Sequence, residues 1–282
     1  MWFYDVEENR WEFLQGTMRN VFGRYVDIGE AIVNIQKGLE LLRGSERAIV
    51  LSGLAQLYAF AGFYEIADSM VVEVLKLDRD SVNYFRNLAD IDFQTWDHDD
   101  AIENRQKVIS QDGSNAIHFL YLGWHCMYLN QFESALKYVR RWMEDVQHTT
   151  YFSYNMMHRV GYILSQNGCE EEANEFFNKQ ADYCIRLNEL NQVRSYEGWT
   201  YYDLAGVYAY RGDKAKAYEN LRIMVEIGST SWYGMARLIE IDPLFFSIRD
   251  EPEFIQIVSD VLTKILAEHK RVRLLLEENE ML

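Results

Sequence analysis

Six histidines are the residues with the clearest capacity for metal chemistry, and their spacing does not build a metal site. His118 and His125 stand two helical turns apart, whereas a zinc-binding helix presents two histidines four residues apart. His98 lies in the acidic run 97–100, where carboxylates favour the positive end of a helix dipole. We interpret this run as a helix start, and we expect neither a metal ion nor another cofactor.

Motifs for nucleophilic catalysis and phosphate binding are missing from the sequence as well. It has no glycine-rich phosphate loop and no serine in a nucleophile elbow. Cys126, Cys169 and Cys184 are odd in number and widely spaced, so they predict neither a disulfide framework nor a catalytic Cys–His pair. The 44 carboxylates, including the run 170–172, are typical of solvated helix faces. The sequence therefore predicts a protein that is not an enzyme.

Three alanines set a period of 34 residues, namely Ala67, Ala101 and Ala135. Around each of them, large apolar residues recur at intervals of three and four, which places them on one stripe of a helix. Two further copies surround Ala173 and Ala217, after insertions, and the second insertion is expected to lengthen a helix. A repeat of this length is typical of a solenoid built from helix–turn–helix units.

Each unit carries small residues where its two helices must approach closely, because a larger side chain would push the helices apart. In the first helices these residues are Ala55, Ala89, Gly123, Gly161 and Ala205. The turn between the helices falls at residue types that tolerate a positive φ. These are Gly62, Asn130, Gly168 and Gly212. Trp96 takes this place in the second unit, so a different turn is expected there.

This pattern resembles the tetratricopeptide repeat family, in which an aromatic residue, Leu-Gly, Tyr, Ala and Phe recur at these offsets. The match covers residues 48–227, and a degenerate copy with Ala31 at the key position extends it toward residue 12. Arg79 and Gly113 stand where the family has a closing proline. The resemblance implies an all-α, right-handed superhelical solenoid of about five to six antiparallel helix pairs. A related class of helical-hairpin array is the alternative.

Composition agrees with a helical chain and limits its partners. The sequence has 2 prolines and 49% hydrophobic residues, without an apolar run of the length that spans a membrane. Its net charge of −16 repels the negatively charged phosphate backbone of nucleic acids, so no direct nucleic-acid contact by this segment is expected. Residues 1–10 lack the basic and apolar parts of a secretion signal, and the unpaired cysteines favour a reducing compartment. The cysteine pattern thus favours the cytoplasm over the periplasm.

The pattern divides the chain into N-terminal helices with the degenerate repeat (1–47), the solenoid (48–227) and a C-terminal capping segment (228–282). Pro243 and Pro252 in the last part suit helix starts. The aromatic and aliphatic residues around them are expected to seal the end of the solenoid, namely Phe245, Phe246, Ile248 and Phe254. This segment resembles the element that closes repeat arrays in bacterial multidomain regulators.

A long final helix is expected over residues 253–278. Its apolar stripe consists of Ile257, Val261, Ile265, Val272 and Leu276. Terminal repeats need a polar outer cap, and this helix suits that role. The alternative is that it pairs two chains into a homodimer.

In the tetratricopeptide repeat family, the first helix of each unit lines a concave face that binds a peptide or protein. Carried over position by position, the resemblance implies a groove of mainly aromatic side chains with a few polar ones. Its residues are Gln56, Phe60, Arg86, Asp90, Phe93, Trp124, Tyr128, Asn155, His158, Tyr162, Trp199 and Tyr202. Aromatic anchors with sparse polar partners are typical of recognition sites. The alternative is that these rings pack against a neighbouring repeat or the final helix.

The resemblance thus implies a non-enzymatic scaffold that binds a protein or peptide in its concave groove. Only Arg86 and Asn155 match the residues with which chaperone-binding relatives grip a terminal carboxylate. An apolar or aromatic-rich peptide, or a folded protein surface, is therefore the expected partner. The alternative function, based on the closing element, is a ligand- or partner-sensing segment of a larger bacterial transcriptional or signalling regulator.

Overall fold

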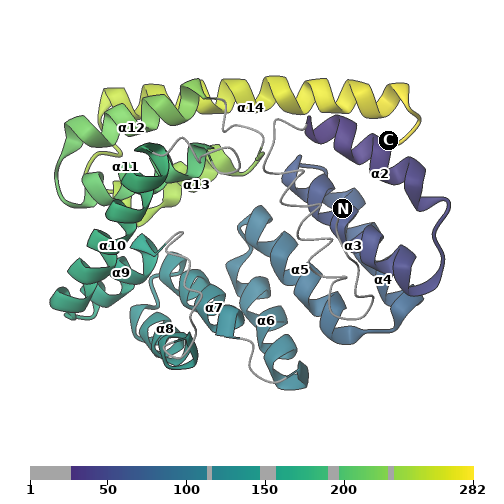
Figure 1. Cartoon of the computed structure of the whole chain (residues 1–282), viewed down its shortest axis with the longest axis horizontal. Helices are drawn as coiled ribbons and strands as arrows, with labels where there is room; N and C mark the ends of the chain where they lie inside the picture. Colours follow the sequence, from purple (N-terminus) through teal and green to yellow (C-terminus); the bar gives the residue numbers. More distant parts are fainter. Residues whose placement is uncertain (1–26, 113–115, 147–156, 190–196, 228–231) are drawn as a thin grey trace.

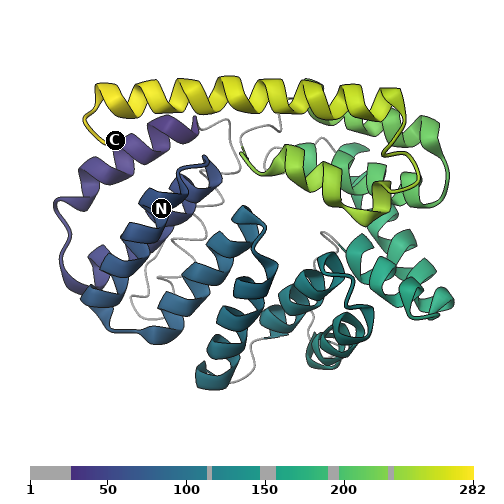
Figure 2. The ribbon, with the colours of Figure 1, turned by 180° about the vertical axis from the view of Figure 1, so that it is seen from behind.

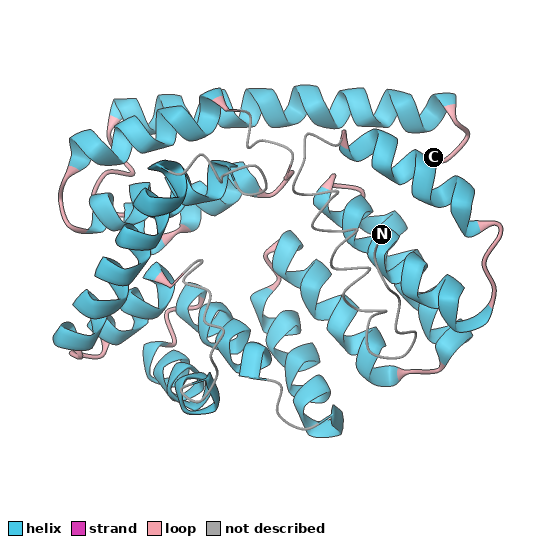
Figure 3. Ribbon diagram, in the orientation of Figure 1, coloured by secondary structure: helices cyan, strands magenta, loops and turns pink. Residues whose placement is uncertain are grey.

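The computed structural model describes residues 27–112, 116–146, 157–189, 197–227 and 232–282, and every regular element within these ranges is a helix (Figure 3). The elements are α2 (Ile28–Leu39), α3 (Gly44–Phe60), α4 (Tyr64–Asp78), α5 (Ser81–Thr95), α6 (His98–Asp112), α7 (Ala116–Tyr128), α8 (Phe132–Val146), α9 (His158–Gln166), α10 (Glu170–Glu189), α11 (Glu197–Tyr210), α12 (Lys214–Glu226), α13 (Met235–Ile241), the 3₁₀ turn η1 (Pro243–Phe245) and α14 (Pro252–Glu278). The predicted all-α repeat solenoid is confirmed.

Consecutive helices form five pairs, and the predicted small residues are buried in every pair. The pairs are α3 with α4, α5 with α6, α7 with α8, α9 with α10, and α11 with α12. Ala55 of α3 and Ala67 of α4 are both fully buried. A Cβ atom added to Gly123 would lie 2.7 Å from Cγ2 of Val139 on the paired helix. The predicted lengthening is also present, because α10 has 20 residues whereas α4, α6 and α8 have 15 each.

One turn geometry recurs between the two helices of all five pairs. A residue with positive φ ends the first helix, and the next residue donates its N–H to the carbonyl five residues earlier, which satisfies the carbonyls that the helix end leaves open. These donors and acceptors are Phe63 to Tyr58, Asp97 to Asp92, Gln131 to Cys126, Cys169 to Leu164, and Asp213 to Tyr208. The predicted positive φ is confirmed at Gly62, Asn130, Gly168 and Gly212.

The expectation of a different turn at Trp96 is wrong. Trp96 adopts φ 66°, the same left-handed conformation that its counterparts adopt. This conformation costs a side chain with a Cβ roughly 1–2 kcal/mol. The ring of Trp96 packs against Phe93, His98 and Tyr128, so packing contacts offset that cost.

Helix α14 joins the two ends of the array (Figures 1 and 2). It has 27 residues and is therefore about 40 Å long. Its first half packs on α12 and α13, and its second half packs on α2. The sequence predicted a cap at one end of the solenoid, whereas the helix contacts both ends. We call the array closed by α14 the helix ring.

The predicted apolar stripe of α14 is buried along its whole length, with Ile257, Val261 and Ile265 in one core cluster and Val272 and Leu276 in another. The prediction that four apolar residues around Pro243 and Pro252 seal the end of the solenoid is only partly correct. Phe245, Ile248 and Phe254 are buried, whereas Phe246 is 45% exposed, with the Arg249 guanidinium 3.7 Å from its ring centroid.

We predict that Gly123→Ala destabilises the protein by about 1–3 kcal/mol, because the added methyl group overpacks the contact with Val139. Gly38→Ala is the matched control, since Gly38 lies in α2 with no atom within 4 Å of an added Cβ. Alanine at this position should stabilise the protein by about 0.5–1 kcal/mol through its higher helix propensity. Urea unfolding of both variants measures the difference. Equal effects would contradict the close approach of α7 and α8.

Candidate binding site on the inner side of the helix ring

Four aromatic rings surround the indole of Trp232, which is 4% exposed and stands just before α13. Its ring centroid lies 6.1 Å from that of Phe60, 6.4 Å from Phe93, 5.8 Å from Trp96 and 5.6 Å from Trp199. We call these five residues the Trp232 cluster. The indole N–H of Trp232 is buried and has no hydrogen-bond acceptor among the described residues.

The ends of several helices place these rings. Phe60 is the last residue of α3, Trp96 follows the end of α5, and Trp199 lies in the first turn of α11. The backbone next to Trp232 is held as well, because the N–H of Tyr233 donates to the carbonyl of Phe60 at 2.9 Å. A Cβ atom at Gly62 would lie 2.5 Å from the ring of Tyr233, so glycine serves there for both conformation and space.

A buried pair of histidines adjoins the Trp232 cluster. His98 and His125 both contact the ring of Phe93, and their Nδ1 atoms lie 3.1 Å apart. One of these atoms must carry the proton and the other must accept it, so the accepting ring must be neutral. Burial lowers the pKa of His98 to about 4, against the opposing effect of Asp97 and Asp99. Burial, together with Arg105 and His98, lowers the pKa of His125 well below its usual value.

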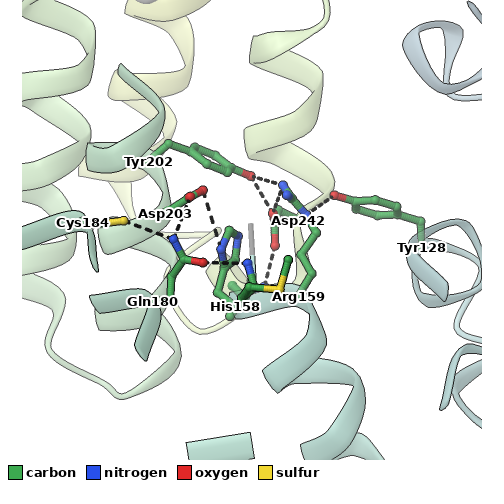
Figure 4. A network of polar contacts seen from close by, with 10 residues as sticks. Tyr128, His158, Arg159, Gln180, Cys184, Tyr202, Asp203 and Asp242 are labelled. Carbon is green, nitrogen blue, oxygen red and sulfur yellow. Dashed lines mark hydrogen bonds and ion pairs between the residues drawn. The ribbon is translucent and has the colours of Figure 1, made fainter. Parts of the chain in front are cut away.

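A polar network around Arg159 lies beyond the histidines (Figure 4). The fully buried guanidinium of Arg159 donates from Nε to the Tyr128 hydroxyl at 2.9 Å and from Nη2 to Asp242 Oδ2 at 3.1 Å. The Tyr202 hydroxyl donates to the same carboxylate oxygen at 2.5 Å. We call these four residues the Arg159 network. It joins α7, α9 and α11 to the start of η1.

Asp242 has two roles, because its other oxygen, Oδ1, accepts the N–H of Leu244 at 3.1 Å and caps η1. Tyr128 and Tyr202 are buried beside this carboxylate, and burial is the main cause that raises the pKa of both phenols. The two hydroxyls therefore stay protonated, and the buried positive charge of Arg159 is balanced by Asp242.

A second group of buried polar side chains connects α9, α10 and α11. Gln180 accepts the N–H of Met157 at 2.6 Å and donates to Asp203 Oδ2 at 3.0 Å. His158 Nδ1 lies 3.6 Å from Asp203 Oδ1. Burial, followed by the charge of Arg159, lowers the pKa of His158 well below its usual value, so this ring is neutral. These contacts fix the position of α9 against its neighbours.

The structure brings together seven of the twelve predicted groove residues. Phe60, Phe93 and Trp199 belong to the Trp232 cluster, and Tyr128 and Tyr202 belong to the Arg159 network. Trp124 lies against Arg159, at 5.6 Å from ring centroid to guanidinium, and His158 adjoins the same network. Tyr202 and His158 are fully buried, so they pack against the chain itself as the alternative interpretation expected.

The other predicted residues lie apart from this centre. Gln56 donates to Asn87, Asp90 pairs with Arg105, and Tyr162 packs between Phe132 and Tyr210. Arg86 is half-buried on α5, and Asn155 lies outside the described residues. The role of all twelve residues as a partner-binding groove stays a prediction.

Three central residues escaped the sequence analysis: Trp232, Arg159 and Asp242. Trp232 follows a loop beyond the last repeat, and Arg159 is a charged residue inside an apolar helix. Asp242 directly precedes Pro243, which the sequence predicts only as a helix start. The Asp-Pro dipeptide is the sequence signal that could have identified Asp242. An aspartate that caps a helix uses one carboxylate oxygen for the cap, and when it is buried its second oxygen can bind a cation such as Arg159.

Two properties bear on possible chemistry. Within the described ranges, no cluster of three or more His, Cys, Asp or Glu side chains has a metal-binding arrangement. None of the helices in those ranges is long and apolar enough to cross a bilayer.

Comparisons with known proteins give a partial structural likeness. No family model and no curated protein matches the sequence. A crystal structure of MamA aligns with 61% of this chain and 92% of its own, at 18% identity and a TM-score of 0.38. A second solved structure, of MamA AMB-1, aligns with 63% of this chain and 93% of its own, at 19% identity and a TM-score of 0.39. The fold assignment therefore rests on the helix pairing described above.

We predict that Asp242→Asn destabilises the protein by about 3–5 kcal/mol, because it leaves the buried charge of Arg159 without a counter-charge. Asparagine still caps η1, so the loss reports on the ion pair. Asp213→Asn is the matched control, since Asp213 also caps a helix but pairs with the exposed Lys216. Its cost should stay below about 1 kcal/mol. Chemical denaturation measures the free energy of unfolding of both variants. Equal losses of stability would contradict the predicted importance of the ion pair between Arg159 and Asp242.

Acidification should destabilise the protein through the histidine pair. The unfolded chain protonates His98 near pH 6.5, whereas the folded chain does so near pH 4. Stability is thus complete above pH 6.5 and falls as the pH drops toward 4, by up to about 1.4 kcal/mol per pH unit for each histidine. The double variant His98→Phe, His125→Phe should lose less stability than the wild type between pH 7.5 and 5. Parallel curves for the two proteins would rule out this contribution.

Proposed function

We propose that this chain is a non-catalytic binding module that holds a peptide or protein segment against the inner side of the helix ring. The observation that carries the proposal is the Trp232 cluster. Three helices of the array, α3, α5 and α11, direct aromatic rings at a single indole that comes from outside the repeats. The inner side is thus shaped to receive an aromatic side chain.

The chemistry around Trp232 suggests what a partner would offer. Trp232 stacks on its neighbours, and the residue after it makes a backbone hydrogen bond to Phe60, as an extended bound peptide would. Three buried donors nearby have no acceptor among the described residues, namely the indole N–H groups of Trp124 and Trp232 and Nη1 of Arg159. Buried polar atoms in proteins nearly always have partners, so backbone carbonyls of a bound segment would complement them. We infer an aromatic peptide segment that competes with Trp232 for its position.

A second candidate function is the sensing of a ligand or partner within a larger regulator. The contact of α14 with both ends of the ring favours it, because an occupant that displaces Trp232 would also disturb α13 and α14. A small change inside the ring would then reach a helix on its outside. This arrangement couples an internal site to an external surface through one packed element.

A random peptide library selected on the whole chain tests the binding function. We expect selected peptides to be rich in tryptophan or tyrosine, and Phe93→Ala to weaken their binding at least about tenfold, which is 1.4 kcal/mol. Phe246→Ala is the matched control, because Phe246 is exposed and lies outside the Trp232 cluster. Trp232→Ala should strengthen binding, since it removes the internal competitor. Calorimetry measures all four affinities.

The outcomes separate the alternatives. If Phe93→Ala and Phe246→Ala weaken peptide binding equally, the peptide does not bind at the inner side of the helix ring. Weaker binding in Trp232→Ala would make Trp232 part of the receptor and not a competitor. Hydrogen exchange of α14 with and without peptide then distinguishes the two functions, because a sensor changes the protection of α14 and a simple scaffold does not.

A further inference from the structure

The outer face of α14 carries an exposed apolar stripe that the ring does not use. Ile255 is 57% exposed, Leu262 45% and Leu266 48%, and the exposed Ser259 lies between them. At 100° per residue these four positions share one narrow face of the helix. The buried residues Ile257, Val261 and Ile265, on the side that packs against the rest of the ring, lie about 120° around the helix from this stripe. Isolated exposed leucines are common, whereas a stripe of them on one helix face marks an interaction surface.

We propose that this stripe pairs with the same stripe of a second copy of the chain, with the two α14 helices antiparallel. The spacing of the four residues is 4, 3 and 4, which reads the same in both directions. Antiparallel pairing about the midpoint between Asp260 and Val261 therefore sets Ile255 against the partner's Leu266 and Ser259 against the partner's Leu262. Such self-complementarity is the requirement for a two-fold symmetric interface.

Charges at the ends of the stripe match this arrangement. The same symmetry brings the exposed Lys270 next to the exposed Asp250 of the second copy, whereas the adjacent Glu251 is already bound by Lys214 and Tyr218 of its own chain. Two charged residues lie between Ile255 and Leu266, and both face away from the stripe. Lys264 donates to the carbonyl of Val225 on α12, and Asp260 accepts from Gln256 on its own helix. Ser259 thus meets Leu262 at the centre, Ile255 meets Leu266 on either side of it, and opposite charges meet at both ends, whereas a parallel pair would place like charges together.

The size of the surface sets the strength of the dimer. One helix face per chain lies at the low end of specific interfaces, below about 1,200 Å² in total. The dimer should therefore dissociate on dilution, within the range from about 1 mM to about 1 μM in which weak complexes exchange. The stripe residues lie outside the Trp232 cluster, so dimerisation can be measured separately from the proposed binding function.

Sedimentation equilibrium of the whole chain over that concentration range tests the proposal. We expect a monomer–dimer equilibrium, and Leu262→Glu with Leu266→Glu should weaken it by at least about tenfold. Leu274→Glu is the matched control, because Leu274 is 50% exposed on the same helix but lies about 100° around it from the stripe. This variant should dimerise like the wild type.

A charge exchange gives a second, independent measurement. Asp250→Lys should weaken the dimer by repulsion from Lys270 of the second copy, and adding Lys270→Glu should restore it. A monomer at every concentration would overturn the proposal. The proposal would also be overturned if Leu274→Glu weakened the dimer as much as Leu262→Glu with Leu266→Glu, or if the charge exchange failed to restore the dimer. Because the exchange involves exposed residues only, it remains decisive even if the leucine variants lose their fold.

Discussion

The close approach of the two helices in each pair is the constraint on which the structure depends. Alanine or glycine at the contact lets the backbones meet, and a single added methyl group at Gly123 would already reach Val139 at 2.7 Å. Every pair repeats the buried small residues and the same turn, so the pairs stack in a regular array. The accumulated curvature brings α2 and α12 within reach of one helix, α14.

The interior of the ring follows from that closure and not from any single repeat. Phe60 and Trp199 come from the first and the last complete pairs, yet both contact Trp232. Curvature converts side chains that are far apart in sequence into one cluster. The left-handed conformation of Trp96 is tolerated for the same reason, because the rings around it hold the indole in place. The inner side is thus a rigid aromatic surface with buried polar groups beside it.

Periodicity predicted the parts of the fold that depend on local contacts. The helix pairs, their small residues, four of the five turns and the apolar stripe of α14 all follow from spacings within one unit or one helix. The ion pair of Arg159 and Asp242 joins residues 83 apart, and the position of Trp232 depends on the curvature of the whole array. A repeat pattern sets the contacts between neighbours but leaves this curvature open. The sequence therefore assigns the twelve groove positions to one face, whereas the structure divides the described ones between an aromatic cluster, a polar network and contacts within and between repeats.

The two ends of the ring are not held equally. On the α12 and α13 side, α14 buries Phe254, Ile257, Val258, Val261 and Ile265. On the α2 side it buries Val272 and Leu276, with Leu275 partly buried beside them, and polar, partly exposed contacts join Arg271 to Asp27 and Asn279 to Lys37. Fewer apolar side chains are buried here, and partly exposed polar contacts add little free energy, so we expect local opening of the ring to begin where α14 meets α2. His269 lies at this junction and contacts Tyr233, the residue next to Trp232. The weaker end of the ring is therefore also the end from which an entering segment would first reach the aromatic cluster.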